Sequence, residues 1–136
     1  MQASTYIQPD KSTEENAIVR MFSWWNDAFI DPKGFTPINF SEHYTDKAVL
    51  IVNGRLRGKG LEELACHYCT LQANFTLIQM ELPVLDSFSC HDRAFVQCVT
   101  KANRGDEWLH EEAMAVATLE NGKIALLKVI GRPIDQ

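Results

Sequence analysis

The feature that most constrains this chain is the dipeptide Asn121-Gly122, which separates two runs of alternating side chains. An Asn-Gly pair in this setting is the strongest short-range signal for a β-hairpin, because both residues tolerate the positive φ angles of a two-residue turn. The sequence therefore predicts a hairpin from Glu107 to Ile130. If Glu120 faces Lys123 and the strands pair without interruption, every side chain of the hairpin falls on one of two faces.

The two predicted faces differ in character. One is apolar near the turn and polar at its far end, and it carries Trp108, His110, Glu112, Met114 and Val116 together with Ala125, Leu127 and Val129. The other is flat, small and apolar, and its centre is Ala113, Ala115 and Ala117. We expect the first face to line a ligand cavity and the second to contact another subunit.

Length and charge narrow the classes of protein. At 136 residues, 46% of them hydrophobic, the chain can bury a core without disulfides or metal. The net charge of -5 argues against nucleic acid as a partner. No run has the signal-peptide pattern or the length of a membrane helix, so we expect a cytoplasmic protein with no membrane partner. The predicted organisation is an N-terminal extension, 1–11, followed by a single domain, 12–136.

Three helices are predicted in the first half of the chain. Ser12-Thr13-Glu14-Glu15 matches a capping box, which predicts a helix from there to about Ile30. Its apolar stripe, at steps of about 100° per residue, comprises Ile18, Met21, Phe22, Trp25 and Phe29. Thr36-Pro37 begins a shorter helix, with Phe40 and Tyr44 pointing inward. A third helix, 61–74, carries Tyr68 on its apolar stripe.

The period then changes from helical to alternating. Strands are predicted at Ala48–Asn53, Arg55–Gly58, Leu77–Leu85, Ala94–Asn103, Glu107–Leu119 and Lys123–Ile130. Pro83 should mark a bulge or an edge position. Helices followed by a mainly antiparallel meander indicate an α+β domain, with a curved sheet wrapped around the helices on one face.

Three local phrases resemble a known superfamily. The segments 43–54, 57–64 and 120–124 are similar to those of the nuclear-transport-factor-two-like superfamily, in particular its SnoaL-like polyketide cyclases and ketosteroid isomerases. The resemblance covers about residues 12–130. It implies a cone-shaped, mixed but mainly antiparallel α+β barrel of the cystatin-like or SnoaL-like kind. It also implies a cavity inside the cone and a homodimer formed through the outer sheet face.

The same resemblance does not supply the isomerase chemistry. Counted along the shared phrases, the position of the proton-shuttling Asp corresponds to Val52, that of the oxyanion-binding Asp to Met114, and that of the helix-one Tyr to about Met21. Enolisation needs a base and acidic donors at these places, and the three residues supply neither. Steroid isomerase activity is therefore not expected.

Two residues remain as candidates for catalysis. His110 and Glu112 are predicted on one strand face, where the carboxylate could stabilise an imidazolium formed when His110 accepts a proton. Alternating polar residues at a strand end are, however, also typical of a solvated rim.

The residues predicted to contact a ligand are Met21, Trp25, Tyr44, Val52, Tyr68, Trp108, Met114 and Val129. An aromatic cluster at helical spacing is more often core than ligand site. A buried Tyr hydroxyl nevertheless needs a polar partner, which in a hollow cone can be a ligand or water.

Two further motifs carry weaker signals. Cys66-His67-Tyr68-Cys69, with Cys90-His91, resembles a metal-ligand spacing, but the first two cysteines lie on one helix and no metal or cofactor is predicted. Arg55, Arg57 and Lys59 precede a helix start and could attract an anion, although a solvated turn is the default interpretation.

Two functions remain at this point. The first is a binding protein or enzyme for a small apolar molecule, with cyclase, dehydratase or isomerase-type proton transfer if it is an enzyme. The second is a non-catalytic assembly module that acts through the outer sheet face. A homodimer is expected under both.

Overall fold

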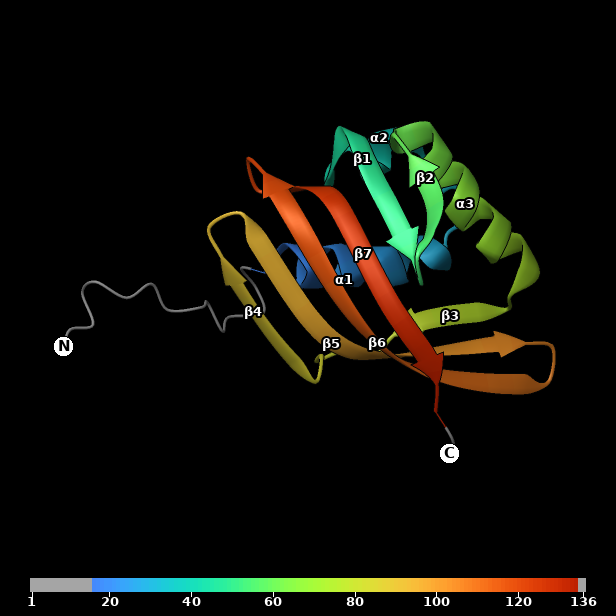
Figure 1. The fold of residues 1–136 in the computed structure, drawn as a ribbon. Coiled ribbons are helices and arrows are strands. Elements are labelled where there is room, and N and C mark those ends of the chain that lie inside the picture. The colour runs from blue at the N-terminus through green and yellow to red at the C-terminus, as the bar shows by residue number, and fades with distance from the viewer. Residues whose placement is uncertain (1–15, 135–136) are drawn as a thin grey trace.

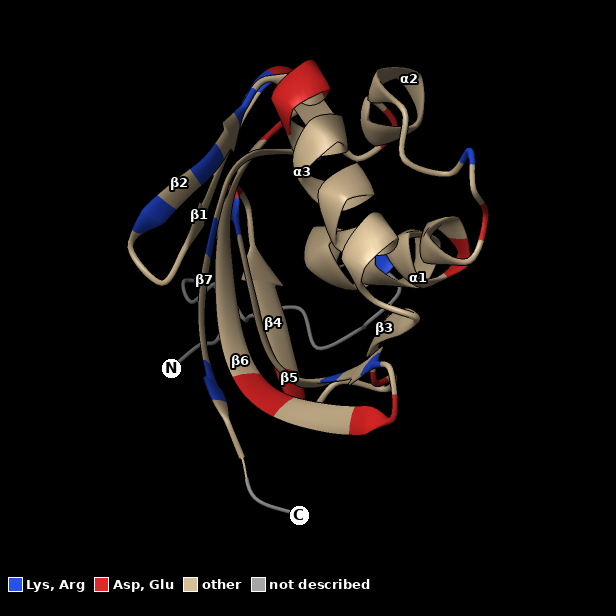
Figure 2. Ribbon diagram, turned by 90° about the vertical axis from the view of Figure 1, so that its right-hand side faces the viewer, with Lys and Arg blue, Asp and Glu red and all other residues tan. Residues whose placement is uncertain are grey.

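The computed structural model describes residues 16–134, so the predicted extension 1–11 and the capping box at 12–15 lie outside the described residues. The chain forms helices on one side of a seven-stranded sheet, as Figures 1 and 2 show. The elements, in order, are α1 (Ala17–Phe29), α2 (Pro37–Phe40), β1 (Tyr44–Val52), β2 (Arg55–Lys59), α3 (Leu61–Asn74), β3 (Leu77–Met80), β4 (Asp86–Cys90), β5 (Arg93–Arg104), β6 (Glu107–Glu120) and β7 (Lys123–Pro133).

The sheet has the strand order β2-β1-β7-β6-β5-β3, and β4 also pairs with β5. Neighbouring strands are antiparallel except β1 and β7, which run parallel. The long strands β5 and β6 curl beneath the helices (Figure 2), which confirms the predicted curved α+β architecture. Of the helices in residues 16–134, none has the length and apolar character required to cross a bilayer.

Helix α1 begins later than the capping box predicts. Its N-cap is Asn16, whose side-chain oxygen accepts hydrogen bonds from the backbone N–H groups of Ile18 and Val19 at 2.9 and 3.2 Å. The Asn16 amide also donates to the carbonyl oxygens of Phe88 and Phe95, both at 3.2 Å. One buried side chain therefore both starts α1 and ties it to β4 and β5.

The alanine-rich face of β6 lies inside the molecule, which corrects the prediction that it contacts another subunit. Ala113, Ala115 and Ala117 are at most 4% exposed and belong to the same core cluster as Phe22 and Trp25 of α1. Small side chains on β6 leave volume between the sheet and the helices, and the large side chains of α1 fill part of it. The predicted stripe of α1 is confirmed as its buried face.

A β-bulge explains why the predicted faces combined inner residues of β7 with outer residues of β6. Glu120 faces Lys123 as expected, but Leu119 pairs with Ile124 and Thr118 with Leu126, so Ala125 is an extra residue in β7.

Beyond the bulge the register is shifted by one. Met114 therefore faces Ile130 instead of Val129, and Val116 faces Lys128 instead of Leu127. Leu127 and Val129 of β7 lie on the inner face, as predicted. The large residues of β6 that were predicted beside them lie on the outer face. Their exposed fractions are 51% for Trp108, 49% for Met114 and 46% for Val116.

The predicted strand 77–85 is interrupted. Its first part is β3, and the chain then leaves the sheet and returns as β4, which had not been predicted. Both segments pair with β5, β3 with its second half and β4 with its first. Pro83 lies in the interruption, where no ladder hydrogen bond is required of it.

The tip of the β1–β2 hairpin is fastened to β7. Asn53 and Gly54 form the turn with positive φ angles of 50° and 80°. The Asn53 backbone N–H donates to the Val129 carbonyl oxygen at 2.8 Å, and its side-chain oxygen accepts from the Gly131 N–H at 3.0 Å. Asn53 is thus a turn residue that holds the end of β1 in place.

The inward position of the alanines predicts an asymmetric response to added volume. Replacing Ala117 with Leu should lower the free energy of unfolding by about 1–3 kcal/mol, because the site is closed and the extra methyl groups force neighbours apart. Val116→Leu, one residue away on the outer face, should change it by less than about 0.5 kcal/mol. Urea unfolding followed by circular dichroism measures both, and equal effects would contradict the assignment of faces.

Candidate functional site: an apolar cavity with one carboxyl group

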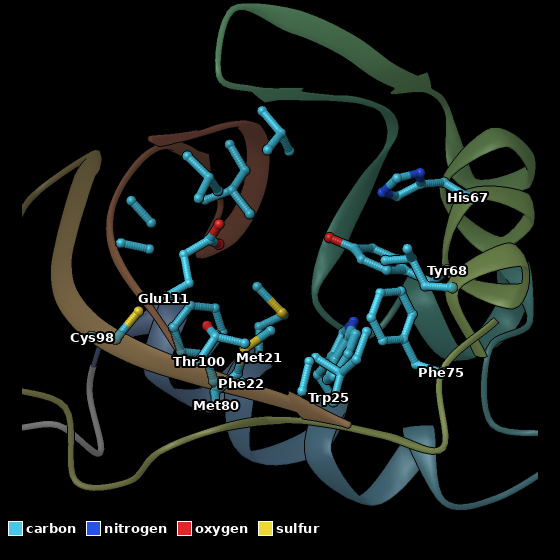
Figure 3. Close-up of a pocket in the computed structure, with 18 of the residues that line it drawn as sticks. Met21, Phe22, Trp25, His67, Tyr68, Phe75, Met80, Cys98, Thr100 and Glu111 are labelled. Carbon is cyan, nitrogen blue, oxygen red and sulfur yellow. Dashed lines mark hydrogen bonds between the residues drawn. The ribbon is translucent and has the colours of Figure 1, made fainter. Parts of the chain in front are cut away.

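A cavity of about 290 Å³ lies between the helices and the concave face of the sheet. Its volume is at the small end of the range for ligand sites. The walls come from α1, α3 and the strands β1, β3, β5, β6 and β7, and they are mostly apolar (Figure 3). The polar or titratable side chains among the lining residues are Trp25, His67, Tyr68, Cys98, Thr100 and Glu111.

Among the described residues, Glu111 is the one that places a carboxyl group in the cavity lining. It is in phase with the buried alanines of β6, and Thr100 is its register partner on β5. A Cβ atom placed on Gly131 would lie 2.8 Å from the Glu111 Oε1 atom, so the absence of a side chain there makes room for the carboxyl group. Within residues 16–134 this carboxyl group has no hydrogen bond or ion pair. Burial raises the pKa of Glu111 above its ordinary value.

Tyr68 faces Glu111 from the opposite wall. Its hydroxyl group extends from α3 into the cavity (Figure 3), and burial raises the pKa of Tyr68, so the group stays neutral and can donate a hydrogen bond. Trp25 stands edge-to-face against the Tyr68 ring, with centroids 5.5 Å apart. The Trp25 indole N–H is buried without an acceptor in the described part of the chain.

Tyr44 lies behind Tyr68 and does not line the cavity. It is 1% exposed, and its hydroxyl group makes no hydrogen bond of good geometry within the described residues, although the Tyr68 hydroxyl is close enough to affect its pKa. Burial is the main reason that the pKa of Tyr44 is raised. Tyr44, which the sequence predicts to contact a ligand, therefore lies in the core next to Tyr68 and outside the cavity lining.

His67 and Cys98 complete the polar lining. Burial, and then the charge of Arg57, lower the pKa of His67, which favours the neutral imidazole. Burial raises the pKa of the Cys98 thiol to about 11, and the nearby Glu111 carboxyl acts in the same direction. Cys98 is thus an unreactive thiol at neutral pH.

Five of the eight predicted ligand residues do line the cavity: Met21, Trp25, Val52, Tyr68 and Val129. Tyr44 is in the core, and Trp108 and Met114 are on the outer face. Of the three positions that correspond to the isomerase residues, Met21 and Val52 therefore lie in the cavity and Met114 does not. The β6 residues beside Met114 that line the cavity are Ala113 and Ala115.

His110 and Glu112, predicted as catalytic, lie on the outer side of β6. The Glu112 carboxylate accepts a hydrogen bond from Gln97 Nε2 at 3.0 Å and has Arg132 at 3.9 Å. His110 is the register partner of Lys101, and its Nδ1 atom is buried without a partner among the described residues. Successive side chains of a strand point to opposite faces. An error of one residue in assigning the faces of β6 therefore placed His110 and Glu112 in the cavity instead of Glu111.

Sequence reasoning missed Glu111 and His67 as cavity residues. The signal that could have found Glu111 is the run of alternate alanines with which it shares a face, since small residues opposite a helix rich in Trp and Phe indicate the packed side. His67 was considered only as part of the Cys66–Cys69 motif. Both of those cysteines are exposed, and no group of three or more His, Cys, Asp or Glu side chains within residues 16–134 is arranged to hold a metal ion.

Comparison with known proteins gives a match in structure but not in sequence. No family model matches the chain, and no curated protein matches it either.

Solved structures do match. A candidate SnoaL-like polyketide cyclase from Jannaschia sp. CCS1 superposes with a TM-score of 0.70 at 14% identity, covering 91% of this chain and 88% of that one. An NTF2-like protein of unknown function from Exiguobacterium sp. 255-15 gives 0.68 at 17% identity, covering 88% and 99%. IdmH from Streptomyces antibioticus, a candidate polyketide cyclase, gives 0.65 at 15% identity, covering 85% and 88%.

The chain therefore has the nuclear-transport-factor-two-like fold, as the sequence resemblance implied. Within that fold its structural neighbours include candidate polyketide cyclases, one of them described as SnoaL-like, and a protein with a ketosteroid isomerase-like fold from Catenulispora acidiphila, solved with trimethylamine. Identities of 9–17% among these neighbours establish the fold and leave the chemistry to the residues of the site.

The raised pKa of Glu111 predicts a pH-dependent contribution to stability. The folded state favours the protonated carboxyl group, so this contribution is fully present below the ordinary value of 4.5 and is lost as the pH rises through the higher pKa of the folded state. The free energy of unfolding of the wild type, relative to Glu111→Gln, should therefore fall over this interval and then level off. Chemical denaturation at a series of pH values measures it, with Glu107→Gln as the control for a lost charge on β6. A difference that is constant with pH would contradict the prediction.

Proposed function

We propose that this protein binds a small, largely apolar molecule in the cavity and transfers a proton to or from it, with Glu111 as the general acid or base. The observation that carries the proposal is the Glu111 carboxyl group, which lies in an apolar cavity, has no ionic partner within residues 16–134 and has a raised pKa. Such a group is poised for proton transfer nearer neutral pH than an ordinary carboxylate.

The surrounding donors suit a ligand that carries a carbonyl or enol oxygen. The neutral Tyr68 hydroxyl can donate a hydrogen bond to an oxygen placed between the two walls, and the Trp25 indole N–H is a second buried donor without an acceptor in the described structure. Removal of a proton from the carbon next to a carbonyl leaves charge on that oxygen, which such donors stabilise. This is the reaction step common to cyclase, dehydratase and isomerase chemistry. The similarity of fold to SnoaL-like polyketide cyclases is consistent with it.

The test uses 2-tetralone, a compact apolar ketone with exchangeable α-hydrogens, in deuterated buffer. We expect the wild type to accelerate exchange of these hydrogens, measured by ¹H NMR. Glu111→Gln should reduce the catalysed rate by about 10²–10⁴-fold because the proton acceptor is lost. Tyr68→Phe should reduce it by about 10²-fold because one donor to the developing oxyanion is lost.

Glu112→Gln is the matched control, since it makes the same change on the outer face of the same strand. It should leave the exchange rate unchanged, and circular dichroism should show that all variants fold. Equal rates for the wild type and Glu111→Gln would remove the proposed role of Glu111.

The second candidate function is the assembly module, and it now involves different residues from those predicted. The outer face exposes Met114, Val116 and Ile130, the last at 71%, together with Phe88 in the middle of β4 at 38%. Met114 and Ile130 are register partners, and Phe88 stacks on Phe95 with centroids 5.0 Å apart. We propose that a second copy of the chain covers this face, because exposed apolar side chains gathered on one sheet surface are typical of an interface.

This interface predicts a change of oligomeric state on substitution. Wild-type protein should be a dimer by light scattering after size exclusion, and Met114→Glu should be a monomer, because the interface would then bury an unpaired charge. Ser23→Glu, on the exposed side of α1, adds the same charge elsewhere and should remain dimeric. A wild type that is monomeric at micromolar concentration would refute the interface.

A further inference from the structure

Two arginines of β2 stand beside the cavity. Arg55 is the register partner of Val52, so both side chains lie on the same face of the sheet, and Val52 lines the cavity. Arg57 is close enough to lower the pKa of His67, another lining residue. Figure 2 shows the basic residues of β2 along the sheet edge that lies next to α3.

Within the part of the chain that the structure describes, these positive charges have no acidic partner. Both side chains are exposed, and neither forms an ion pair within residues 16–134. The acidic residues in the first turn of α3 are Glu62 and Glu63, and the Glu63 carboxylate accepts a hydrogen bond from the Lys59 backbone N–H at 2.9 Å. In a chain of net charge -5, two exposed cations that have no ion pair among the described residues and lie beside an apolar cavity are not explained by packing.

A third cation lies at the opposite side of the cavity. The Arg104 guanidinium carbon is 5.0 Å from the centre of the Phe75 ring, and Phe75 lines the cavity. Arg104 is already held by this contact, and Glu107 is its register partner across the β5–β6 hairpin. It is therefore less available to a ligand than Arg55 and Arg57.

We propose that the molecule bound in the cavity carries an acidic group, a carboxylate or a phosphate, and that Arg55 and Arg57 bind this group while the apolar part occupies the cavity. The inference rests on the proposed function and narrows its ligand class. Guanidinium groups present paired N–H donors that match the oxygens of both anions. The fastening of Asn53 to β7 holds the hairpin, and so the backbone of Arg55, next to the cavity.

The test compares two fluorescent probes of nearly the same shape. N-phenyl-1-naphthylamine is neutral, and 8-anilinonaphthalene-1-sulfonate adds one sulfonate group. We expect both to bind, and the sulfonate to bind more tightly at low salt. The double variant Arg55→Gln/Arg57→Gln should weaken sulfonate binding by about 10-fold and leave binding of the neutral probe unchanged. High salt should have the same selective effect on the wild type.

Matched variants show where the probes bind. Arg93→Gln removes one positive charge at the distant β4–β5 turn and should change neither affinity. Leu109→Trp, at a lining position that is 39% exposed, should block the cavity and weaken both probes. Val129→Phe is a second blocking variant if the first does not fold.

Competition against the neutral probe distinguishes the two anions. Decanoate and decyl phosphate should each displace it at lower concentration than decanol, and the double arginine variant should abolish this advantage. A larger advantage for decyl phosphate assigns the site to phosphate monoesters, and an equal or larger advantage for decanoate assigns it to carboxylates.

Two failures are distinguishable. If the neutral probe does not bind, or if Leu109→Trp and Val129→Phe leave its binding intact, the cavity is not a ligand site and the proposed function fails together with this inference. If the neutral probe binds in the cavity but the anions show no advantage, or keep it in the double arginine variant, only the role of Arg55 and Arg57 is overturned.

Discussion

The packing of α1 against the concave face of the sheet, where β6 carries alanines at alternate positions, is the constraint on which the rest of the structure depends. Aromatic side chains of the helix need volume, and the sheet provides it by carrying methyl groups at alternate positions. Three consequences follow from this one arrangement. The helix side of the sheet is defined, and the large apolar residues of β6 are left on the outer surface. The cavity lies over the inner face of β6, where Ala113 and Ala115 line it and Glu111 is the next residue in phase.

The cavity lining contains few polar groups, and most of them are neutral. It contains one carboxyl group, whose raised pKa reflects burial, and groups that remain neutral at physiological pH, namely the tyrosine hydroxyl, the indole N–H and the thiol. The unpaired cations lie outside this lining, on β2. Charge is therefore separated from the apolar space, so a ligand can lose its hydration over most of its surface without burying a cation beside it.

Much of the fold could be predicted from periodicity alone. The buried stripe of α1 and that of α3, including Tyr68, follow from helical spacing, and the β6–β7 turn follows from Asn121-Gly122. The faces of that hairpin could not be predicted by counting, because Ala125 is inserted in β7 and nothing in its residue type signals a bulge. The same error affected the predicted site, since His110 and Glu112 were assigned to the cavity, and the face of the alanines, which also carries Glu111, was assigned to the outside.

Gly131 brings together two features that are distant in the sequence. Its N–H donates a hydrogen bond to the side chain of Asn53, in the turn that leads into β2. Its lack of a side chain leaves space for the carboxyl group of Glu111. The separation between the arginines and the acid is thus determined by one residue in the rigid frame of the sheet. A molecule that contacted both the arginines and the Glu111 carboxyl group would therefore be selected for its length.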